Sequence, residues 1–249
     1  MNTFQTEIIF FKRSTLLWFI LALFAFVSAW SLLMTMEVFA SVQVKFASMR
    51  DAPTLYQGII YPVMVMQSKL MILLVAIVAG LSYSRLSQNN AWPLLLSSCQ
   101  SEWSIVIQKY LASFVIAMVF VLPVFAALIC LSFLAKIAIF PVLMSLFALL
   151  LLIAWMLAMG HFLSSLVNNA GFAVLLCTLV LMVFLMLSQS TIAVTWGKNW
   201  IQVFSPFYHF KRINSDIFSM VSLFYFFSNI ALLLGLTMIR LKHKRYLLS

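Results

Sequence analysis

Long apolar stretches, broken by short groups of charged residues, dominate this sequence of 249 residues. A transmembrane helix needs about 20 mainly apolar residues to cross the hydrocarbon core of a bilayer. Formal charges are absent from four longer intervals, residues 14–36, 110–135, 137–197 and 217–239. The third interval is long enough for two helices, and continuous apolarity of this length favours helices over strands.

A further apolar stretch, residues 59–83, is interrupted by Lys69, whose long side chain can reach the bilayer surface. Serine, asparagine and glycine residues between positions 164 and 171 predict a polar turn inside the long interval. Pro123 predicts a kink in the third span. The sequence therefore predicts an all-α integral membrane protein with a single transmembrane domain over residues 1–249 and six spans, at residues 14–36, 59–83, 110–135, 141–163, 170–190 and 217–239.

Composition agrees with this class. Hydrophobic residues make up 65% of the chain, charged residues 8%, and the mean hydropathy is +1.13, which leaves too little polar material to coat a soluble domain. The net charge of +10 indicates headgroup anchors beside apolar runs rather than nucleic-acid binding. Six spans place both termini on one side, and the basic residues near them favour the cytoplasm. We expect a multi-pass protein of the bacterial cytoplasmic (inner) membrane.

The residues before the first span form an amphipathic pattern. Phe4, Ile8 and Phe11 recur at helical spacing, whereas Glu7 and Lys12 are polar. This pattern predicts a helix that lies flat in the inner membrane interface. A frayed cytoplasmic tail is the alternative interpretation.

The sequence contains none of the common motifs for nucleotide, metal or serine-hydrolase chemistry. No glycine belongs to a Gly-x4-Gly-Lys phosphate-binding loop, so the chain is not expected to hydrolyse ATP itself. His161, His209 and His243 are widely separated, and no His-Glu-x-x-His or Gly-x-Ser-x-Gly element occurs. The three cysteines do not have the spacing of a zinc site. We expect neither enzymatic activity nor a bound metal or cofactor in this chain.

A polar island, residues 85–109, separates the second and third spans. It contains a short amphiphilic segment, too brief to cross a bilayer, which needs an apolar partner or the membrane interface. Ser101 is expected to cap the helix that follows. A cytoplasmic loop whose leucines rest on lipid is the plainer interpretation. The residues of interest in the island are Asn90, Trp92, Pro93, Leu94, Leu95, Leu96, Ser97, Ser98, Glu102, Trp103 and Lys109.

Two runs resemble a known family. LLLSSCQSEWSIVIQKYLASF, from Leu94, is similar to the segment of type-2 ABC-exporter permeases in which a leucine-rich coupling helix precedes a Trp-x-Ile-Val-x-x-Lys element. FSPFYHFKRINSDIF, from Phe204, resembles the Ser-Pro-x-Tyr-His-Phe segment before the sixth span in the gliding-motility-like branch of that class. Both runs stand at the expected places in a six-span order.

The resemblance implies a permease subunit that couples ATP hydrolysis by a separate P-loop ATPase to export or to conformational work. Residues 90–98 would form a cytoplasmic coupling helix that docks on the ATPase, and Glu102, Trp103 and Lys109 would connect it to the third span. ATP and Mg²⁺ would bind the partner subunit, and a second permease chain, identical or related, would complete the unit. The family's acidic and Gly-Thr residues before the leucines are replaced here by residues 88–93, QNNAWP, so docking would depend more on Trp92 and the leucines.

A second class stays open, that of a membrane scaffold or assembly factor with the same six spans and no cargo. Polar residues within the spans do not assign a substrate site. We expect them near span ends, where contact with the interface accounts for them. These residues are Gln67, Lys69, His161, Gln189 and Asp216.

Overall fold

The computed structural model describes residues 3–46, 54–88, 101–135, 138–189, 203–215 and 219–248. Its regular elements are helices, six of them long and apolar enough to cross a membrane, so the prediction of an all-α membrane fold with six spans is confirmed. The elements are α1 (Thr3–Arg13), α2 (Thr15–Phe46), the π-helix η1 (Tyr56–Ile60), α3 (Tyr61–Gln88), α5 (Glu102–Leu134), α6 (Ile139–Leu166), α7 (Ala170–Leu187), α10 (Pro206–Asn214) and α11 (Met220–Leu248).

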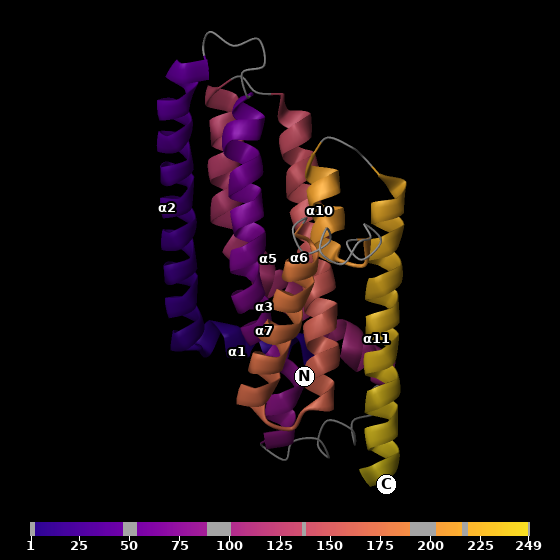
Figure 1. Cartoon of the computed structure of the whole chain (residues 1–249). Coiled ribbons are helices and arrows are strands. Elements are labelled where there is room, and N and C mark those ends of the chain that lie inside the picture. Colours follow the sequence, from indigo (N-terminus) through magenta and orange to yellow (C-terminus); the bar gives the residue numbers. More distant parts are fainter. Residues whose placement is uncertain are drawn as a thin grey trace.

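The long helices run alternately up and down, so α1 and the C-terminal end of α11 lie at the same end of the bundle (Figure 1). The C-terminal end of α3 and the start of α5 lie at this end as well. Residues 89–100, which include the predicted docking residues Asn90 to Ser98, lie outside the described part of the chain.

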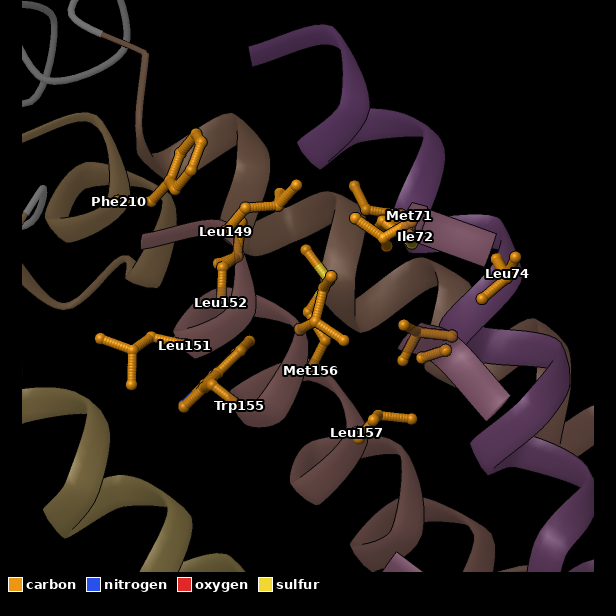
Figure 2. Packing of buried hydrophobic residues seen from close by; sticks show 14 of the residues in the cluster. Met71, Ile72, Leu74, Leu149, Leu151, Leu152, Trp155, Met156, Leu157 and Phe210 are labelled. Carbon is orange, nitrogen blue, oxygen red and sulfur yellow. The ribbon is translucent and has the colours of Figure 1, made fainter. Parts of the chain in front are cut away.

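Helix α6 forms the centre of the fold, because α3, α5, α7, α10 and α11 all pack against it. Most of its side chains are buried, which explains why an apolar helix shows no amphipathic pattern. Trp155 of α6 stacks edge-on against Phe184 of α7, with ring centroids 5.1 Å apart. Figure 2 shows side chains of α6, such as Leu149 and Met156, in one apolar cluster with Met71 and Ile72 of α3 and Phe210 of α10.

Small residues allow α3, α6 and α7 to approach closely. A Cβ atom added at Gly160 would stand 2.6 Å from the Cβ of Ala79, and one at Gly80 would stand 3.1 Å from the Cα of Val174. Close approach of this kind is a common way to pack helices where lipid removes most of the hydrophobic driving force. Next to the contact, Ser164 donates a hydrogen bond of 2.7 Å to the Gly80 carbonyl.

One local expectation differs from the structure. Ser164 and Ser165 were expected in the turn after the fourth span, but α6 continues to Leu166 and buries both hydroxyls. Each hydroxyl donates to a helix carbonyl, so a serine within an apolar helix need not end it. The turn is shorter, and Asn169 caps α7 by accepting hydrogen bonds from the N–H groups of Gly171 and Phe172.

Candidate functional site

The start of α5 carries the described residues of the polar island. Ser101 caps this helix as expected, since its Oγ accepts a hydrogen bond of 3.3 Å from the Ser104 N–H. The helix begins at Glu102, well before position 110, where the third span was expected to start. Trp103 is 45% exposed, whereas Glu102 and Lys109 face other parts of the chain. The first turns of α5 thus extend the third span into the island.

Glu102 is tied to the C-terminal helix. Arg245 of α11 donates a hydrogen bond of 2.5 Å from its guanidinium to the Glu102 carboxylate. The two side chains retain 35% and 21% exposure, respectively, and ion pairs accessible to water contribute at most about 1 kcal/mol. This contact positions the end of α11 against the start of α5 more than it stabilises the fold.

Lys109 is tied to the N-terminal helix. Its ammonium forms an ion pair with Glu7 of α1 and donates a hydrogen bond of 3.1 Å to the Ser82 carbonyl of α3. It also lies 5.2 Å from the centre of the Tyr83 ring. The Lys109 side chain is 4% exposed and that of Glu7 28%, and a buried ammonium requires such partners because its desolvation is costly. Glu7 and Lys109 therefore join α1, α3 and α5 at one point.

A layer of buried polar side chains lies beside this point. His161 of α6 is fully buried and shares a hydrogen bond of 3.0 Å with Ser113 of α5. The rings of Tyr83 and Tyr110 meet the imidazole edge-on, with centroids 5.5 and 6.1 Å away. Tyr110 donates to the Ala154 carbonyl at 3.1 Å. Polar groups of α3, α5 and α6 thus meet in the interior, where the Nδ1 atom of His161 has no hydrogen-bond partner among the described residues.

The expectation that intramembrane polar residues lie at the interface is wrong for two of them. His161 is buried as described, and Gln67 is 1% exposed and accepts a hydrogen bond of 3.2 Å from Ser28 of α2. Neighbouring helices of the bundle supply the hydrogen-bond partners of both side chains, and the sequence does not reveal which helices pack together. Lys69 and Gln189 are exposed as expected, and Asp216 lies outside the described residues.

The second motif forms α10, which packs against the half of α6 far from α1 (Figure 1). His209 is 1% exposed. Its Nε2 lies 2.8 Å from the Val203 carbonyl and its Nδ1 3.0 Å from the Ser222 hydroxyl, so the neutral ring donates to Val203 and accepts from Ser222. Burial lowers the pKa of His209, the nearby Arg212 acts in the same direction, and the bond to Val203 opposes them.

Tyr56 anchors α10 from another side. Its hydroxyl donates to the main-chain carbonyl of Asn214 at 2.6 Å and also lies 2.6 Å from the Ser145 hydroxyl of α6. Ser205, just before α10, donates to the Phe184 carbonyl of α7. Burial also lowers the pKa of Lys211, with a further contribution from the charge of Lys69. These contacts fix α10 among η1, α6, α7 and α11.

Sequence reasoning missed the partner of Lys109. One signal was available, because the whole chain contains only five carboxylates and a membrane protein seldom places an acid without a partner. Glu7 was expected only as a polar residue of the amphipathic N-terminal helix. Its pairing with a lysine of the third span depends on how α1 folds back over the bundle.

The described residues define an all-α, multi-pass membrane protein. In this part of the chain no group of three His, Cys, Asp or Glu side chains is arranged to hold a metal ion. Comparison with protein-family models gives no match, and comparison with curated proteins gives none either.

Proposed function

We propose that this chain is the transmembrane permease subunit of an ABC transporter. It couples ATP hydrolysis by a separate P-loop ATPase subunit to export or to conformational work across the membrane. The proposal rests on the two sequence runs that resemble type-2 exporter permeases and on the six-span fold. We also propose that the protein lies in the bacterial inner membrane and that both of its termini face the cytoplasm.

The observation that carries the proposal is the double attachment of α5. Its first turns follow directly after the segment proposed to dock on the ATPase, and two ion pairs connect these turns to α1 and to the end of α11. A force on residues 90–98 would therefore reach three helices together. Helix α5 is continuous from Glu102 to Leu134, which allows it to transmit motion along the whole span.

In the proposed mechanism, ATP binding closes the partner ATPases and moves the docking segment. Helix α5 tilts with that segment and carries α1 along through Lys109 and Glu7. The path between two permease chains then changes its accessibility. A non-transporting scaffold with the same fold would have no need to pass on such motion.

Recovery of partners is the first test. The tagged chain is extracted in a mild detergent that preserves its folded state, and co-purifying proteins are identified by mass spectrometry. We expect a P-loop ATPase in stoichiometric amount. A folded preparation that repeatedly lacks an ATPase would contradict the permease function and favour the scaffold.

Substitution of the docking segment is the second test, made in the complex with the recovered ATPase. Leu95→Asp and Trp92→Ala should abolish the response of ATP hydrolysis to the permease while leaving the thermal unfolding of the chain unchanged. Trp30→Ala is the matched control, because Trp30 of α2 is 55% exposed and distant in sequence from the docking segment. A normal response in Leu95→Asp would remove the docking role of this segment.

A further inference from the structure

A groove of about 480 Å³ lies between α1, α2, α3 and α5. This size is within the range of about 300–1,000 Å³ that is usual for small-molecule sites. Apolar side chains line most of it, among them Phe11, Leu17, Ile77, Val78 and Ile116. Polar side chains from α1, α3 and α5 line the remainder. The groove is therefore shaped for an amphiphile rather than for a polar solute.

The charged side chains that line the groove carry a net positive charge. Lys109 and Glu7 neutralise each other, but Arg85, in the last turn of α3, has no carboxylate within ion-pair distance among the described residues. Its guanidinium lies over the Phe10 ring at 4.2 Å, which holds the cation at the edge of the groove. One uncompensated positive charge favours an anionic group at this place.

A buried hydroxyl also lacks a partner there. Ser82 is 7% exposed, lines the groove, and its Oγ has no hydrogen-bond partner among the described residues. A buried hydroxyl without a hydrogen bond is costly. An ester carbonyl placed in the groove would accept its hydrogen.

The order of these groups along α3 matches one ligand class. Arg85 marks the end of the span, Ser82 comes one turn deeper, and Ile77 lies about 12 Å below Arg85 at 1.5 Å per residue. We propose that the groove binds one anionic glycerophospholipid from the leaflet that contains α1. The phosphate pairs with Arg85, an ester carbonyl accepts from Ser82, and an acyl chain lies along Ile77, Val78 and Ile116.

Such a lipid would fill the space between α1 and the bundle and hold the interfacial helix in place. Its binding needs no ATPase subunit, so it can be tested on the permease chain alone. The probe is a bilayer disc containing equal amounts of phosphatidylglycerol and phosphatidylcholine. Native mass spectrometry after mild detergent extraction then counts the lipids that each chain retains.

We expect one phosphatidylglycerol per wild-type chain and no comparable retention of phosphatidylcholine. Arg85→Gln should reduce the occupancy about tenfold, the loss expected for a charge-assisted hydrogen bond. Arg13→Gln is the matched control, because Arg13 is an exposed cation at the end of α1 that does not line the groove. Ser82→Ala removes an unpartnered hydroxyl, is expected to fold normally, and should reduce occupancy about threefold.

Equal retention of phosphatidylglycerol by Arg85→Gln and Arg13→Gln would overturn the site. Retention of phosphatidylcholine as strong as that of phosphatidylglycerol would overturn its anionic character. Size-exclusion elution and thermal unfolding establish that each variant is folded. If Arg85→Gln does not fold, unchanged occupancy in Ser82→Ala decides against the proposal.

Discussion

Glu7 and Lys109, 102 residues apart in the sequence, form an ion pair that fastens the N-terminal helix α1 to the third transmembrane helix α5. The ammonium is the more deeply buried partner, and the Ser82 carbonyl accepts a further hydrogen bond from it. The pair thus joins α1 to the helix that continues directly from the polar island.

Removal of Glu7 alone should destabilise the protein. Glu7→Gln leaves the Lys109 ammonium buried without its counter-charge, which costs about 3–5 kcal/mol when a pair is fully buried. Because Glu7 is 28% exposed, water screens the remaining charge, and we expect a loss of about 1–3 kcal/mol in the free energy of unfolding. Reversible denaturation in mixed micelles measures this change.

The double variant Glu7→Gln/Lys109→Met separates charge burial from other effects of the substitution. It should be more stable than Glu7→Gln, since no buried charge remains. Glu37→Gln, which changes an exposed acid of α2, is the control and should unfold like the wild type. A Glu7→Gln variant as stable as this control would show that the pair does not hold α1.

Gly160→Ala should weaken the packing of α6 on α3. The added methyl would stand 2.6 Å from the Ala79 Cβ, so the helices must separate, at a cost of about 1–3 kcal/mol. Gly235→Ala is the matched control, because an added Cβ there meets nothing within 4 Å. Thermal unfolding followed by circular dichroism compares the two variants.

Ala79→Gly in the Gly160→Ala background should restore part of the lost stability, because it removes the atom with which the new methyl collides. Because residues 79 and 160 are in contact, the changes in the free energy of unfolding caused by the two substitutions should not add in a double-mutant cycle. Strictly additive losses in the cycle would place the origin of the destabilisation elsewhere than this contact.

Acidification should destabilise the part of the fold around α10 through His209. Its pKa in the folded protein is lower than the ordinary value of about 6.5, mainly because of burial. The unfolded chain therefore binds more protons as the pH falls below about 6.5, and the free energy of unfolding decreases by at most about 1.4 kcal/mol per pH unit. At higher pH His209 is neutral in both states and adds no pH dependence.

Comparison of variants measures the contribution of His209 to the pH dependence of stability. His209→Gln should lessen the decrease in unfolding temperature between about pH 7 and pH 5, whereas His243→Gln, at an exposed position near the end of α11, should show the same decrease as the wild type. Identical pH profiles for the wild type and His209→Gln would contradict the role of His209.

Several features were determined by the sequence alone. Apolar stretches of helix length predicted six membrane-spanning helices, because lipid offers no hydrogen bonds and the backbone must satisfy its own. Ser101 predicted the cap of α5, because its hydroxyl can accept from a free N–H group of the first turn. Both signals are local, and both are confirmed.

The tertiary structure alone decided which polar groups meet. Lys109 stands in the polar island before the third span and His161 was expected near a span end, yet both are buried with partners on other helices. In an apolar helix almost every side chain favours burial, so the sequence does not reveal which face meets α6 and which meets lipid. Close contacts such as that of Gly160 with Ala79 determine which helix faces pack together. The packing then determines which polar and charged side chains become neighbours.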